Sequence, residues 1–253
     1  MVSADASAHA RPPVLRIGTS GWSYDHWRGV FYPENLPASE RLAFYAARFA
    51  TVEIDATFYR LPSADTVARW RDAVPQDFVF AVKGSRFITH FRKLADTTDQ
   101  VRAFLERMGL LGPKLGVVLW QLPPTLQRDD RLLEGFIRRL PSDGPRHAVE
   151  FRHESWLHDG VLDLLRTYGV AMVNVSGDML REDLTATADF VYARFHGTSR
   201  YHGAYERPAL QPWAAFLRER LAAGSDCFAY FNNDFEGHAP ADAARLAAML
   251  EER

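Results

Sequence analysis

Charged and polar side chains recur at alternate positions in several short apolar segments of the sequence. Side chains of a β-strand alternate between its two faces, so the charged residues of one segment would share a face. The residues that follow this pattern are Glu53, Asp55, Lys83, Glu150, Arg152, Arg194, His196 and Asn232. Carboxylates and imidazole can transfer protons, while lysine and arginine bind anionic oxygens. Together they predict metal-independent acid–base chemistry on a small anionic substrate, such as a phosphorylated sugar or a nucleotide.

We expect these residues to divide into catalytic and binding groups. Glu150 or Glu53 would act as the base, and His196 as the acid or proton shuttle. Lys83 would bind the anion, or would itself act as a base or as a Schiff-base nucleophile. The predicted substrate-binding residues are Arg152, Arg194, Asn232, Trp22 and Tyr24. The last two are aromatic and are expected to stack on a sugar or a base.

Buried ion pairs offer a purely structural explanation of the same residues. A barrel interior could hold Glu150 with Arg194 or Arg152, and it could hold Glu53 with Lys83. Removing ions from water costs several kcal/mol for each ion, so an apolar interior would stabilise a scaffold more simply. We therefore favour a functional site over a structural network.

Eight short apolar segments rich in β-branched or aromatic residues would form the strands that position these side chains. They span residues 14–20, 51–55, 78–83, 115–121, 147–152, 170–174, 190–196 and 227–232. Amphipathic helical patterns lie between most of them, at residues 39–49, 64–73, 97–108, 129–140, 157–168, 212–222 and 239–251. This alternation predicts a single (β/α)8 TIM barrel with a short or degenerate sixth helix. The charged residues would then meet at the carboxyl ends of the strands, joined by Gln121 and Asn174.

The composition fits one globular domain, since 47% of the 253 residues are hydrophobic and 25% are charged. We predict a disordered tail at residues 1–13, which lack the apolar core of an export signal, and one domain at residues 14–253. A formal net charge of −2 disfavours nucleic-acid binding through the overall field. No apolar segment approaches the length of about 18 residues that spans a bilayer, so we expect a cytoplasmic protein. Cys227, the single cysteine, is predicted to be a core residue.

A divalent-metal site is the main chemical alternative. The residues that would supply carboxylate and imidazole ligands are Glu150, His153, Asp178, His196 and Asp234. The neighbouring lysine and arginines would repel a cation, so we expect neither a metal ion nor a cofactor. The sequence also lacks the P-loop lysine and a G-x-S-x-G nucleophile elbow, which disfavours nucleotide hydrolysis of the P-loop type and serine-hydrolase chemistry.

Several segments form a recognisable set that extends in order over nearly the whole chain after the tail. They include GTSGWSY at residues 18–24, VEIDATFY at 52–59, FAVK at 80–83, WQLPP at 120–124, VEFRH at 149–153, RFHG at 194–197 and YFNND at 230–234. This set resembles the signature stretches of the YecE-like family, a domain of unknown function. The resemblance implies a TIM-barrel fold, and its motifs contain Glu53, Lys83, Glu150, Arg152, Arg194, His196 and Asn232. It predicts Asn where this chain has Asp55, so the chain carries an additional negative charge there.

The family resemblance implies no particular reaction, so hydrolase, lyase and isomerase activities all stay open. A likeness to endonuclease IV rests on fold analogy and implies a divalent-metal-dependent phosphodiesterase that acts on nucleic acid. A third hypothesis is a non-enzymatic protein that binds a ligand in the same pocket. The expected partner in the leading hypothesis is a small anionic molecule.

Overall fold

The strands of the protein form one eight-stranded parallel sheet, which curves into a barrel in the order β1-β8-β7-β6-β5-β4-β3-β2. The computed structural model describes residues 11–177, 184–198 and 202–252. The strands are β1 (Leu15–Thr19), β2 (Thr51–Ile54), β3 (Val79–Lys83), β4 (Leu115–Gln121), β5 (Arg146–Glu150), β6 (Ala171–Ser176), β7 (Phe190–Phe195) and β8 (Asp226–Phe231). The predicted (β/α)8 barrel is confirmed, and each strand begins and ends within about two residues of its predicted segment. Most of the predicted tail lies outside the described residues.

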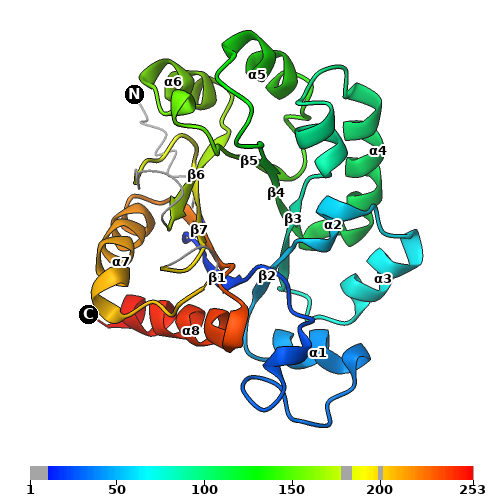
Figure 1. The fold of residues 1–253 in the computed structure, drawn as a ribbon, viewed down its shortest axis with the longest axis vertical. Coiled ribbons are helices and arrows are strands. Elements are labelled where there is room, and N and C mark those ends of the chain that lie inside the picture. Colours follow the sequence, from blue (N-terminus) through cyan, green and yellow to red (C-terminus); the bar gives the residue numbers. More distant parts are fainter. Residues whose placement is uncertain (1–10, 178–183, 199–201, 253) are drawn as a thin grey trace, which may run out of the picture.

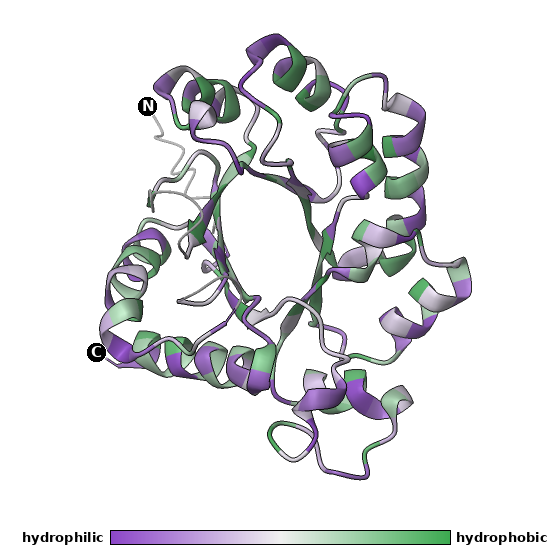
Figure 2. Cartoon of the chain, in the orientation of Figure 1, coloured by the Kyte–Doolittle hydropathy of each residue, from purple (hydrophilic) through white to green (hydrophobic). Residues whose placement is uncertain are grey.

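Most helices lie outside the ring of strands, as the view down the barrel shows (Figure 1). They are α1 (Arg41–Ala46), α2 (Ala56–Tyr59), α3 (Ala64–Asp72), α4 (Thr98–Met108), α5 (Asp130–Ile137), α6 (Asp159–Thr167), α7 (Arg207–Ala222) and α8 (His238–Glu251). Polar and apolar residues alternate along them (Figure 2), as expected for helices with one face on the sheet and one in water. Within the described residues, no helix is both long and apolar enough to cross a membrane.

Three details of the helices refine the expectation. The helix α7 begins at Arg207, ahead of the predicted start, because Pro208 occupies its first turn and Pro212 is accommodated inside it. Residues 184–189, ahead of β7, form no helix, whereas residues 178–183 of the predicted sixth unit lie outside the described residues. The single turn of α2 was not predicted, because four residues are too few to show a helical period.

The barrel closes between β1 and β2 with the help of a tyrosine side chain. An isolated bridge joins Ser20 to Glu53 at the carboxyl end of this seam. Next to it, the backbone N–H of Thr19 donates to the Tyr45 hydroxyl at 2.9 Å, and this hydroxyl donates to the carbonyl oxygen of Thr51 at 3.1 Å. Tyr45, from α1, therefore carries the hydrogen bonding across a seam where the two strands pair little with each other.

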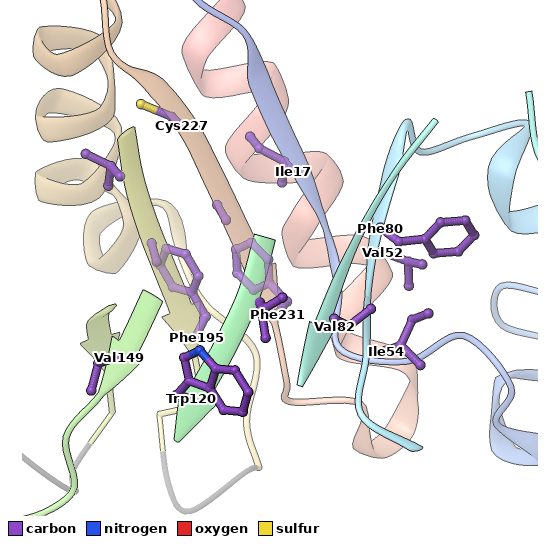
Figure 3. Close-up of a cluster of buried hydrophobic side chains, with 14 of the residues drawn as sticks. Ile17, Val52, Ile54, Phe80, Val82, Trp120, Val149, Phe195, Cys227 and Phe231 are labelled. Carbon is purple, nitrogen blue, oxygen red and sulfur yellow. The ribbon is translucent and has the colours of Figure 1, made fainter. Parts of the chain in front are cut away.

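Two apolar layers lie on the two faces of the strands. The outer layer packs under the helices, and Figure 3 shows part of it, with Ile17 between its strand and α8. Cys227 belongs to this layer, where burial raises the pKa of its thiol to about 12. The inner layer includes Ala81, Leu119, Ala148, Phe190 and Tyr230. Because side chains alternate along each strand, the inner layer gives way to the charged residues toward the carboxyl ends.

Candidate functional site

Arg194, on β7, is the centre of a hydrogen-bonded network inside the barrel. Its Nη1 donates to Glu150 Oε2 and its Nη2 to Glu53 Oε1, each at 2.6 Å. The Tyr192 hydroxyl donates to Glu53 Oε2 at 2.5 Å, and the Ser20 hydroxyl also hydrogen-bonds Glu53. Arg194 and both glutamates have an exposed fraction of 0%. We call these five residues the buried network; its one guanidinium lies between two carboxylates taken from different strands.

Arg152, His196 and Asn232 extend this network toward the carboxyl ends of β5, β7 and β8. The Arg152 Nε forms an ion pair with Glu150 Oε1, and its Nη2 lies 3.0 Å from His196 Nε2. The other ring nitrogen of His196 lies 3.2 Å from the amide of Asn232. Arginine can only donate, so a neutral His196 accepts at Nε2 and carries its proton on Nδ1. The Asn232 amide must then turn its oxygen toward that proton.

Lys83 and Asp55 form a second ion pair at the carboxyl ends of β3 and β2. Asp55 Oδ1 lies 3.2 Å from Lys83 Nζ and 3.7 Å from Arg194 Nη2. The Lys83 ammonium also lies over the ring of Phe58, 4.4 Å from its centroid. The side chain of Asp55 is 21% exposed and that of Lys83 is 10% exposed. This pair therefore lies at the opening of the barrel, whereas the buried network lies beneath it.

Burial and charge set the ionisation of the site in a consistent way. Burial alone would raise the pKa of Glu150, but Arg152 and Arg194 outweigh it and hold that pKa well below its ordinary value. Burial of Asp55 is likewise outweighed, by Lys83 and Arg194, so its pKa is lowered. Burial lowers the pKa of His196 to about 4, although Glu150 acts in the opposite sense. At neutral pH Glu150 and Asp55 are therefore ionised, and the imidazole of His196 is neutral.

Trp22 and Tyr24 lie beside this opening, in the segment that follows β1. The Tyr24 hydroxyl donates to the backbone oxygen of Ser20 at 2.7 Å, which fixes its ring close to the buried network. Gly21 permits this approach, because its φ is +81° and a Cβ there would lie 2.4 Å from the Tyr24 hydroxyl oxygen. Trp22 packs edge-to-face with Trp70, with ring centroids 5.6 Å apart. Both predicted aromatic residues therefore border the charged site.

The connection between β3 and α4 has an irregular backbone. Residues Phe87–Phe91 form one turn of π-helix, and Lys93, Leu94 and Asp96 have φ angles of 47°, 71° and 50°. Left-handed backbone at such residues costs on the order of 1–3 kcal/mol each, and both features concentrate at functional sites. His90 lies within this turn, where burial and then Lys83 lower the pKa of its ring. The irregular segment therefore borders the same opening.

The structure brings the predicted site residues together, and it also corrects some contacts. Lys83 pairs with Asp55 rather than with Glu53, whose charge is met by Arg194. Asn174 does not join the ring, because its side chain faces outward and accepts the backbone N–H of Thr185 at 2.7 Å. The parity that places Val173 and Val175 inside the barrel places Asn174 outside.

Two members of the buried network, Ser20 and Tyr192, were not predicted. Tyr192 precedes Arg194 by two residues and so shares its face, and Ser20 follows β1 at the same level. The alternation rule that identified the charged residues contains the signal for both. A hydroxyl group does not stand out in an apolar segment as a charged side chain or an amide does, so these two residues were missed.

Among the residues that the structure describes, no group of three or more His, Cys, Asp or Glu side chains could hold a metal ion. Asp178, one of the candidate ligands, lies outside the described residues. His153, another, caps a short turn, where its ring accepts the backbone N–H of Ser155 at 3.2 Å.

The family model described as "Protein of unknown function DUF72" matches residues 16–253. The chain belongs to this family. The predicted resemblance is thereby confirmed, since the UPF0759 protein YecE of Escherichia coli (strain K12) is 33% identical over 148 residues, covering 58% of this chain and 52% of YecE. The UPF0759 protein YunF of Bacillus subtilis (strain 168) is 24% identical over 272 residues, covering 94% of this chain and 95% of YunF.

Solved DUF72 structures share the fold over nearly the whole chain. The DUF72 family protein TM1631 of Thermotoga maritima has a TM-score of 0.86 and 29% identity, covering 94% of this chain and 100% of that one. The DUF72 family protein EF0366 of Enterococcus faecalis has a TM-score of 0.81 and 21% identity, covering 95% and 96%. The DUF72 family thus accounts for the barrel, and the chemistry must be argued from the site.

Proposed function

We propose that this DUF72 protein is an enzyme that binds a small anionic substrate, a phosphorylated sugar or a nucleotide, and transfers protons with its own side chains. The observation that carries the proposal is the position of Lys83, Asp55 and Arg152 above the buried network. Their charged groups lie at the carboxyl ends of three different strands, the edge at which TIM barrels assemble their active sites.

Lys83 and Arg152 are suited to hold the anion from two sides. An ammonium supplies a compact positive charge, and a planar guanidinium can bind two oxygens of a phosphate or carboxylate. The contacts of Arg152 with Glu150 and His196 fix its plane before any substrate binds. Because the site is organised in advance, little side-chain entropy would be lost on binding.

Lys83 and Asp55 are the proposed proton-transfer pair. Asp55 is the only one of the three site carboxylates with exposed surface, and its Oδ1 lies 3.2 Å from Lys83 Nζ. Glu53 and Glu150 were the bases expected from the sequence. We assign them to positioning instead, because both are fully buried and Arg194 already binds one oxygen of each.

The test is turnover of a panel of phosphorylated sugars and nucleotides in the presence of EDTA. The wild-type protein should turn over at least one of them. Lys83→Met should lower that rate by about 100-fold or more, the usual contribution of a general acid or base. Arg86→Met is the matched control, since the Arg86 guanidinium lies over the ring of Tyr59 and belongs neither to the buried network nor to the Lys83–Asp55 pair.

Two outcomes would replace the proposal. Activity that EDTA abolishes and a divalent ion restores would favour the metal-dependent phosphodiesterase. Tight binding of an anion, with no turnover of any compound in the panel, would favour the ligand-binding protein. A fully active Lys83→Arg variant would exclude a Schiff base on Lys83 and leave it the role of an anion-binding cation.

A further inference from the structure

An aromatic pocket opens beside the charged site, between the segment after β1 and the helices α1 and α3. Its volume is about 880 Å³, within the range of about 300–1,000 Å³ that is usual for small-molecule sites. Its lining includes Trp22, Tyr24, Asp55, Tyr59 and Trp70, together with the charged residues Arg69 and Asp72. Trp22 and Trp70 pack edge-to-face with their ring planes at 89°, so the two rings form a corner of the lining.

Asp55 belongs both to this aromatic pocket and to the charged site. Its Oδ1 is buried and faces Lys83 and Arg194, so the exposed fifth of the side chain comes from its other atoms. A carboxylate oxygen has two acceptor positions. The pocket therefore joins an aromatic corner to a hydrogen-bond acceptor, directly beside the proposed anion site.

The charges around Asp55 select the kind of group that the aromatic pocket can hold. Two cations already neutralise this carboxylate, so a positively charged guest would meet repulsion from Lys83 and Arg194. A neutral ring with N–H donors avoids that repulsion and can still donate to Asp55. Such a ring can also stack on an indole face, whereas a sugar, which has no aromatic ring, stacks less well.

We propose that the aromatic pocket binds the base of a nucleoside monophosphate whose phosphate lies on Lys83 and Arg152. The base stacks on Trp22 or Trp70, and one of its N–H groups donates to Asp55. The placement of the phosphate rests on the proposed function. The placement of the base narrows the proposed substrate from a phosphorylated sugar or a nucleotide to a nucleotide.

Calorimetric titration of the full chain tests this assignment with three kinds of probe: the common nucleoside monophosphates, ribose phosphate and adenosine. The tightest nucleoside monophosphate should bind the wild-type protein at least about 10-fold more tightly than ribose phosphate. Trp70→Ala should weaken it by about 10- to 100-fold, as expected for the loss of one base-stacking surface. The same variant should leave the affinity for ribose phosphate unchanged, and that unchanged affinity also reports that it is folded.

Phe235→Ala is the matched control, because Phe235 is an exposed aromatic residue after β8 and is absent from the pocket lining. The proposal is overturned if ribose phosphate binds as tightly as every nucleotide, or if Trp70→Ala weakens nucleotide binding no more than Phe235→Ala does. Phosphate binding to Lys83 and Arg152 would then still stand. If Lys83→Met leaves all phosphate affinities unchanged, the proposed function fails instead, and loss of adenosine binding in Trp70→Ala would still support the pocket.

Discussion

The buried guanidinium of Arg194 is the residue on which the site depends. It is bound by two carboxylates that have no exposed surface, so water cannot solvate either carboxylate in its place. Replacing both partners of a buried ion pair with apolar residues can leave the free energy of unfolding unchanged. Removing only one partner leaves an uncompensated buried charge. The role of Arg194 is therefore to hold Glu53 and Glu150 in place beneath the opening.

Arg194→Leu should lower the free energy of unfolding by about 3–5 kcal/mol, because it leaves the buried Glu53 carboxylate without its cation and leaves Glu150 with Arg152 alone. Urea denaturation at neutral pH measures this loss. Arg86→Leu is the control, since it removes an exposed guanidinium and should change the free energy by less than about 1 kcal/mol. A loss below about 1 kcal/mol for Arg194→Leu would show that the network does not exist as described.

The two buried histidines predict a pH dependence of stability. Burial lowers the pKa of both His196 and His147 to about 4 in the folded protein, whereas an unfolded histidine titrates near pH 6.5. The unfolded chain therefore binds more protons below about pH 6.5, and stability is lost as pH falls from there to about 4. Each histidine contributes at most about 1.4 kcal/mol per pH unit.

Denaturation measured between pH 7 and pH 4.5 checks this sign. The free energy of unfolding should fall with decreasing pH, and His147→Gln should make the fall shallower whatever its effect at pH 7. His147 suits this test because it lies against Trp120, and it is not a member of the buried network. A free energy that stays constant down to pH 5 would contradict the assigned neutral histidines.

At the scale of single elements, the seam between β1 and β2 is the junction of the barrel that has an isolated bridge in place of a ladder of paired residues. Gly18 has no room for a side chain, since a Cβ there would lie 2.4 Å from the Thr51 carbonyl oxygen and 2.8 Å from the Tyr45 hydroxyl. The contact with Thr51 is to backbone, which cannot rotate away. A methyl group at this position must separate the two strands that carry Ser20 and Glu53.

Gly18→Ala should therefore destabilise the protein by about 1–3 kcal/mol through overpacking. Gly135→Ala is the matched control on α5, where nothing lies within 4 Å of the added Cβ. That change should instead stabilise the helix by about 0.5–1 kcal/mol, because alanine loses less backbone entropy than glycine. The same sign for both variants in urea denaturation would mean that the seam is not tightly closed.

The strands were predictable because each is a short apolar segment, and several of them carry charged residues on one parity. That parity also placed Glu53, Glu150 and Arg194 inside before any contact was known. It could not assign partners, because pairing depends on which strands face each other across the barrel. Asn174 shows the limit of the pattern, since an outward amide that holds a loop looks the same in sequence as an inward one.

At the scale of the whole molecule, the charges are arranged in layers along the barrel. Apolar side chains fill its interior, the buried network lies above them, and Lys83, Asp55 and Arg152 lie at the opening. The aromatic pocket adjoins this opening on one side. In these layers the buried ions support two cations and a carboxylate at the opening, where we propose that the substrate binds.

A crystal structure of the protein soaked in inorganic phosphate tests this arrangement most directly. We predict a tetrahedral anion within hydrogen-bond distance of both Lys83 Nζ and the Arg152 guanidinium, with Arg194 still bound to Glu53 and Glu150. An opening without an anion at saturating phosphate, or phosphate bound only at surface arginines such as Arg86, would contradict the proposed anion site.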